Sequence, residues 1–126
     1  MKKILLIAVL FLFAACGVDR SNPEKVAEKY LKVYFDFEYE KAKEWTAPAG
    51  IGMLDMAIAG MELEGLTPAQ ARKEFGVPGI RVHDSMVTGD YAYVSYSLVV
   101  SEDDATDQRE VLSMMKDDKG DWYVMY

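Results

Sequence analysis

His83 and Asp84 are neighbouring side chains of the types that carry acid–base chemistry. Apolar and polar residues alternate over 80–87, which predicts a strand whose successive side chains point to opposite faces. The two side chains should therefore form no direct dyad. Asp84 falls on the apolar face, where partial desolvation would make its carboxylate a general base. The interpretation that we favour is that a sheet edge or a bulge returns Asp84 to water, which leaves Asp84 only a weak catalytic candidate. His83 shares its side of the strand with Arg81 and Ser85 and is predicted to be exposed.

An acidic run near the C-terminal third could supply oxygen ligands to calcium; its members are Glu102, Asp103, Asp104 and Asp107. The run lacks the ligand spacing and the distal glutamate of the helix–loop–helix calcium motif, so we predict a solvated loop. The chain has no phosphate-binding glycine loop, no nucleophile elbow and no HExxH zinc motif. We therefore expect neither a metal ion nor a cofactor.

Aromatic and methionine side chains are the remaining candidates for a site. Together they could line an apolar cavity in which a few hydroxyl groups orient a ligand. The candidates are Tyr30, Tyr34, Phe37, Trp45, Met53, Met56, Tyr96 and Trp122. Of these we assign Tyr30, Tyr34, Trp45, Met53 and Met56 to the pocket. A fully packed core built from the same side chains is the alternative.

The composition limits the possible partners. The chain has 126 residues, of which 51% are hydrophobic, so it can form one domain with a substantial core. Its net charge of −7 argues against nucleic acid, because phosphate binding needs a basic surface. One cysteine and one histidine exclude an internal disulfide and multi-cysteine or histidine-rich metal centres.

The N-terminal residues have the layout of a secretory signal. Two lysines precede an apolar run over 4–15, which is shorter than the roughly 20 residues that span a bilayer. The run ends in FAAC, which resembles a bacterial lipobox, although the lipobox pattern prefers leucine at Phe13. In a lipobox the cysteine, here Cys16, receives a diacylglyceryl group. An ordinary secretory signal beside a stray cysteine is the alternative.

The lipobox interpretation divides the chain into three parts. We predict a signal peptide over 1–15, the lipidated Cys16 with a polar tether over 16–21, and a single domain over 22–126. Several acyl chains on one cysteine would give stable anchoring. The protein is therefore expected outside the cytoplasm, held by Cys16 to the cell membrane or outer membrane of a bacterium.

The pattern of the domain predicts helices followed by strands. Asn22 and Pro23 begin a helix with strong apolar periodicity, and a shorter helix is predicted over 37–45. Residues 51–63 are apolar around most of a helix and should be buried on more than one side. Thr67 caps a further helix that ends at Gly76. Four strands with tight turns follow from residue 80 onward. This order predicts an α+β fold, with N-terminal helices packed on a curved antiparallel sheet of about four strands.

The arrangement resembles the small bacterial lipoproteins with a nuclear-transport-factor-2-like (cystatin-like) cone fold. The motifs that carry the resemblance are the strand start Gly89, Asp90, Ala92 and Val94 and the last strand Gly120, Trp122 and Val124. The resemblance covers the mature chain except about residues 47–79. It implies a pocket between the helices and the curved sheet. The fold class also includes isomerases and dehydratases that use an Asp or an Asp–His pair.

Tyr91 and Tyr93 alternate away from the apolar face of their strand, and exposed tyrosines suit an interface. We predict that they form a docking surface or the contact of a weak homodimer. The function predicted from the sequence is a membrane-anchored, non-catalytic module that binds a small apolar ligand or a partner protein of the cell envelope. The alternative is a cone-fold isomerase or lyase that uses Asp84 as a pocket carboxylate.

Overall fold

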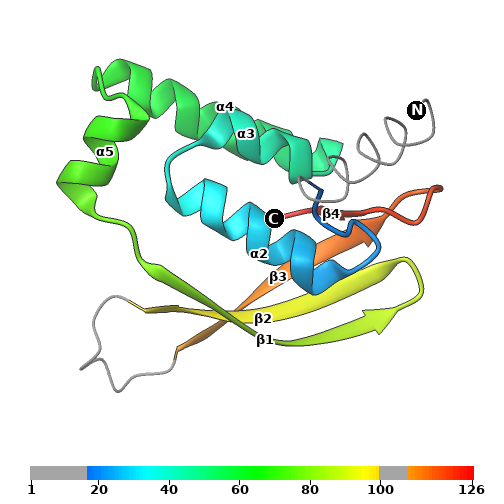
Figure 1. The fold of residues 1–126 in the computed structure, drawn as a ribbon. Coiled ribbons are helices and arrows are strands. Elements are labelled where there is room, and N and C mark those ends of the chain that lie inside the picture. Colours follow the sequence, from blue (N-terminus) through cyan, green and yellow to red (C-terminus); the bar gives the residue numbers. More distant parts are fainter. Residues whose placement is uncertain (1–16, 100–107) are drawn as a thin grey trace, which may run out of the picture.

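The computed structural model describes residues 17–99 and 108–126 (Figure 1). The helices are α2 Pro23–Phe35, α3 Tyr39–Ala42, the 3-10 helix η1 Lys43–Trp45, α4 Pro48–Leu63 and α5 Pro68–Phe75. The strands are β1 Gly79–Thr88, β2 Tyr91–Val99, β3 Arg109–Lys116 and β4 Trp122–Val124. Helices precede the sheet, so the predicted α+β class is confirmed.

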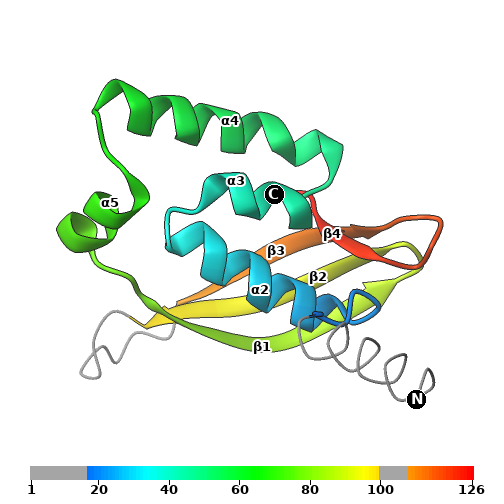
Figure 2. The ribbon, with the colours of Figure 1, turned by 45° about the horizontal axis from the view of Figure 1, so that its top comes forward.

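The strands form one antiparallel meander in which each strand pairs with the next along the chain. Thr88 pairs with Tyr91 across the two-residue turn Gly89–Asp90. Gly89 has a φ of 62°, a conformation that glycine adopts without steric cost. The helices lie on one face of the sheet, which we call the inner face, and no described helix covers the other, outer face (Figure 2).

Helix α2 lies directly on the inner face, and its sequence explains why it forms. Asn22 Oδ1 accepts hydrogen bonds from the backbone N–H groups of Glu24 and Lys25, and Pro23 occupies the first turn. The buried residues of α2 recur at helical spacing, and they are Val26, Ala27, Tyr30, Leu31 and Val33. They share one core with the inner face of the sheet, notably with Val94, Leu112, Met114 and Val124.

The helix predicted over 37–45 begins later in the structure. Phe37 has a φ of 63°, so it is not helical, and α3 starts only at Tyr39. The backbone N–H groups of Phe37 and Glu38 donate to the carbonyls of Tyr34 and Val33, each at 3.0 Å. These two bonds close the C-terminus of α2 around a left-handed residue and reverse the chain direction.

The expectation that residues 51–63 are buried on more than one side is wrong, as helix α4 shows. This helix packs beside α3 and forms the layer farthest from the sheet (Figure 2). Its only buried residues are Gly50 and Leu54. An ion pair of 2.7 Å between Lys43 and Asp55 adds a polar attachment to η1. The apolar composition therefore does not produce burial, because only one side of α4 meets the rest of the chain.

Helix α5 begins as the sequence predicts. Thr67 and Gln70 form a reciprocal capping box, in which each side chain accepts from the other's backbone N–H. Arg72 donates from Nη1 to the Asp36 carbonyl at 2.9 Å and so ties α5 to the end of α2. The helix ends at Gly76, which has a φ of 78°.

The segment 17–21 differs from the polar tether that the sequence predicts. The backbone carbonyl of Arg20 accepts a hydrogen bond of 2.9 Å from the Trp122 N–H. The Arg20 guanidinium lies 4.1 Å from the centre of the Trp45 ring and donates to the Glu44 carbonyl. Val18 packs against the core. The segment is therefore part of the folded domain, because Arg20 joins it to both η1 and β4.

Candidate functional site

The candidate site is a cavity of about 300 Å³ between α2, the first turns of α4 and the inner face of the sheet. Its size is at the lower end for small-ligand pockets, which span roughly 300–1,000 Å³. Its lining residues are Tyr30, Leu31, Tyr34, Phe35, Gly50, Met53, Leu54, Tyr96, Leu112, Met125 and Tyr126. A larger groove beside residues 17–19 is lined mainly by polar and charged side chains.

Three parts of the chain position this lining. Tyr30 and Tyr34 are one helical turn apart on α2, and their rings stack with centroids 5.7 Å apart. Tyr96 extends from β2 on the same side as the buried Val94, because alternate residues of a strand share a face. The chain end lies along β3 because the Met125 N–H donates to the Ser113 carbonyl at 2.8 Å.

The side chains of the cavity suit an uncharged ligand. None of its lining side chains carries a carboxylate, an amine, a guanidinium, an imidazole or a thiol. Its polar side-chain groups are the hydroxyls of Tyr30, Tyr34, Tyr96 and Tyr126. Burial raises the pKa of the Tyr30 hydroxyl to about 12, and burial also raises that of Tyr96. These two hydroxyls keep their protons at neutral pH and can donate to or accept from a ligand.

Stability at high pH should depend on Tyr30, whose pKa is raised from 10.0 to about 12, mainly by burial. Between pH 10 and 12 the folded chain keeps this proton while the unfolded chain loses it. The protonated Tyr30 therefore makes its full contribution to the free energy of unfolding below pH 10, and this contribution is lost between pH 10 and 12. The slope for this group is at most about 1.4 kcal/mol per pH unit. Urea unfolding across this range should show a flatter profile for Tyr30→Phe than for wild type. Tyr93→Phe, on the exposed face, should keep the wild-type slope, and an equally steep profile for Tyr30→Phe would contradict the assignment.

Three of the five predicted pocket residues line the cavity, namely Tyr30, Tyr34 and Met53. Trp45 does not, because it is buried in the core beneath the Arg20 guanidinium. Met56 does not either, because it lies on the outward side of α4 with 75% of its surface exposed. Met53 is itself 65% exposed and stands at the mouth of the cavity.

The lining residues outside the predicted set come from α2, α4, the strands β2 and β3 and the chain end. Leu54 is buried by α4, and Leu112 extends from β3. Tyr96 was in the wider set of candidate lining residues, and the alternation of β2 places it on the apolar face. Met125 and Tyr126 carried no such signal, because their position depends on pairing with Ser113 across the sheet.

His83 and Asp84 lie elsewhere, and the expectation of opposite faces is wrong. The β1–β2 register shifts between Val82 and Ser85, which inserts an extra residue at this point of β1. His83 Nε2 lies 2.7 Å from Ser97 Oγ, and Asp84 Oδ2 lies 3.3 Å from Arg109 Nη1.

Ser97 and Arg109 are directly paired across the sheet, so His83 and Asp84 reach the same face. The Asp84 side chain is 81% exposed, which agrees with the predicted return to water at a bulge and not with a desolvated general base. His83 is half-buried, so the expectation that it is simply exposed is wrong. Neither residue lines the cavity.

The acidic run considered for calcium lies within residues 100–107, outside the described residues. Within 17–99 and 108–126, no group of three or more His, Cys, Asp or Glu side chains is arranged to hold a metal ion. In the same two ranges, no helix combines the length and apolar content needed to cross a bilayer.

Tyr91 and Tyr93 are about half exposed, and the apolar side chains Met86 and Val111 on the neighbouring strands are more exposed still. Tyr93 pairs with Met86 on β1 and with Ser113 on β3, so the tyrosines lie on the central strand β2, between two neighbouring strands. The structure contains one copy of the chain, and the weak homodimer stays a prediction.

Comparisons with protein-family models, with curated proteins and with solved structures found no match to this chain. The resemblance to nuclear-transport-factor-2-like lipoproteins is therefore carried by the sequence motifs alone. The cavity is the feature of the described structure from which a function can be argued.

Proposed function

We propose that the chain is a lipid-anchored binding module of the bacterial cell envelope, whose cavity takes a small neutral apolar ligand. The observation that carries this proposal is the lining, which joins apolar side chains to tyrosine hydroxyls without any charged side chain. An aromatic or alicyclic molecule with a single hydroxyl or carbonyl fits this chemistry, because the hydroxyls could orient one polar atom while the rest is desolvated.

The anchor part of the proposal rests on the N-terminal sequence, where a basic start and an apolar run lead to Cys16. Residues 1–16 lie outside the described part of the structure. The packed segment 17–21 is consistent with an anchor that holds the domain close to the bilayer, because Arg20 joins this segment to the core.

Binding is favoured over the isomerase or lyase alternative. That alternative needs Asp84 inside the pocket with its carboxylate desolvated. Asp84 is instead exposed, is paired with Arg109 and is separate from the cavity lining. The lining also offers no other side chain that would exchange protons with a substrate near neutral pH.

The proposal is tested with N-phenyl-1-naphthylamine, a neutral fluorophore of a naphthalene and a phenyl ring joined by an amine, which brightens in apolar surroundings. Met53→Trp should fill the mouth of the cavity and weaken binding about ten-fold, or ~1.4 kcal/mol. The matched control is Met56→Trp, one turn farther along α4 and outside the lining, which should bind like wild type. Equal affinity for the two variants, or no binding by wild type, would overturn the proposal.

A further inference from the structure

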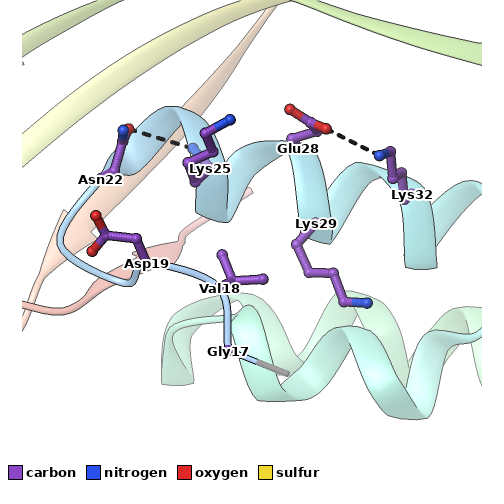
Figure 3. A pocket seen from close by; sticks show the side chains of 8 residues that line it. All are labelled: Gly17, Val18, Asp19, Asn22, Lys25, Glu28, Lys29 and Lys32. Atoms are coloured by element: carbon purple, nitrogen blue, oxygen red, sulfur yellow. Dashed lines mark hydrogen bonds and ion pairs between the residues drawn. The ribbon is translucent and has the colours of Figure 1, made fainter. Parts of the chain in front are cut away.

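A groove of about 470 Å³ lies where the chain enters the folded domain and crosses α2 (Figure 3). Its lining residues are Gly17, Val18, Asp19, Asn22, Lys25, Glu28, Lys29 and Lys32. Gly17 directly follows Cys16 in the sequence. Whatever surrounds an anchor on Cys16 must therefore lie next to this groove.

The entry segment cannot swing freely, because it is fixed to the domain at several points. The Asn22 N–H donates to the Asp19 carbonyl at 3.2 Å, and the Trp122 N–H donates to the Arg20 carbonyl at 2.9 Å. The Arg20 guanidinium is stacked on Trp45. Val18 already packs against the core and only the exposed Gly17 separates it from Cys16, so an anchor on Cys16 would restrict how the domain sits on a surface.

The groove is bordered by lysines at positions 25, 29 and 32, which follow one stripe of α2. Lys32 pairs with Glu28 at 3.0 Å, while the Asp19 carboxylate accepts from the backbone and hydroxyl of Ser21. Within residues 17–99 and 108–126, the ammonium groups of Lys25 and Lys29 have no ion-pair partner.

The lysine side chains are spread along the helix and point in different directions (Figure 3). Such an arrangement does not form a cradle for one small anion, but it can meet several anionic groups spread over a surface. The rest of the chain is acidic, with a net charge of −7 overall, so an anionic surface would repel most other faces.

We propose that this side of α2, with Lys25 and Lys29, lies against the headgroups of anionic phospholipids. The inference rests on the proposed anchor, because the anchor supplies the high local concentration that so small a basic stripe needs. The proposal gives the anchored domain a defined orientation, in which the groove faces the bilayer. The outer face of the sheet lies on the opposite side of α2 and faces away from the bilayer.

The test uses the full chain, lipidated during expression and reconstituted into phosphatidylcholine vesicles with or without phosphatidylglycerol. If Cys16 is acylated, an introduced cysteine is the single free thiol. Lys29→Cys and, on the outer sheet face, Val111→Cys are each labelled with a fluorophore, and a quencher is placed on the lipid headgroups. We expect quenching at position 29 to be several-fold stronger than at position 111, and stronger with phosphatidylglycerol.

The charge is tested in the Lys29→Cys background. Lys25→Glu should reduce quenching in phosphatidylglycerol vesicles, whereas Lys41→Glu, an equal charge change on exposed α3, should not. Chains that float with the vesicles but show equal quenching at positions 29 and 111 would overturn the orientation and leave the anchor standing. Chains that fail to float would overturn both.

Discussion

Cys16→Ala is expected to abolish the incorporation of labelled palmitate into the chain and to leave the fold unchanged. The reason is that acyl chains can be attached only to a lipobox cysteine, and Cys16 is the single cysteine of the sequence. Each buried CH₂ contributes ~0.8 kcal/mol to membrane binding, so the loss of several chains removes nearly all of the anchoring energy. Metabolic labelling followed by gel fluorography measures the incorporation directly.

The matched control for the anchor is Phe13→Leu, which brings the sequence closer to the lipobox pattern and should remain labelled. Thermal unfolding of the wild-type and Cys16→Ala domains should coincide, because position 16 precedes the packed segment. Labelling of Cys16→Ala equal to that of wild type would show that the lipobox interpretation is wrong.

Gly50→Ala is expected to destabilise the domain by about 2–3 kcal/mol, because it forces extra volume into a packed junction. A Cβ at position 50 would overlap the Met125 carbonyl oxygen and would lie 2.7 Å from Thr46 Cγ2. Gly50 and Leu54 are the buried residues of α4, so a shift here would loosen the attachment of the whole helix. The free energy of unfolding in urea measures the effect.

Gly60→Ala is the matched control on the same helix, because a Cβ there meets no atom within 4 Å. It should be neutral or stabilising by up to ~1 kcal/mol, since alanine is the better helix former. Similar stabilities for the two variants would contradict the close approach of α4 to the chain end.

Elements with strong local signals could be predicted from the sequence. Asn22 and Pro23 mark the start of α2, Thr67 marks the start of α5, and the turn at Gly89–Asp90 separates two strands of alternating pattern. In each case the residues that decide the conformation are neighbours along the chain. The order of helices before an antiparallel meander followed from the same local signals.

The position of α4 could not be predicted, because apolar composition does not say which neighbours a helix has. Met56 would be buried if a second layer covered α4, but α3 contacts only one side of the helix. The bulge in β1 was predicted only as one of two ways to return Asp84 to water, because the residue pattern does not separate a bulge from a sheet edge. One extra residue at His83–Asp84 leaves the alternation of apolar and polar residues intact before and after it. It changes only which face of the sheet the residues after the bulge point to, relative to those before it.

The candidate site was predictable to the extent that it lies on one helix. Tyr30 and Tyr34 are one turn apart, so their shared face follows from helical spacing. Trp45 was assigned to the pocket because aromatic character alone does not distinguish a lining residue from a core residue. The Arg20 stacking that removes it from the cavity joins residues far apart in sequence.

The most direct test of the proposed binding function is a crystal structure of the chain grown with N-phenyl-1-naphthylamine. We expect the rings of the probe between Tyr30, Tyr34 and Leu54, with its amine near a tyrosine hydroxyl. The outer sheet face at Tyr91 and Tyr93 offers exposed apolar surface for comparison. Density for the probe on that face, with the cavity between α2 and α4 empty, would contradict the proposal.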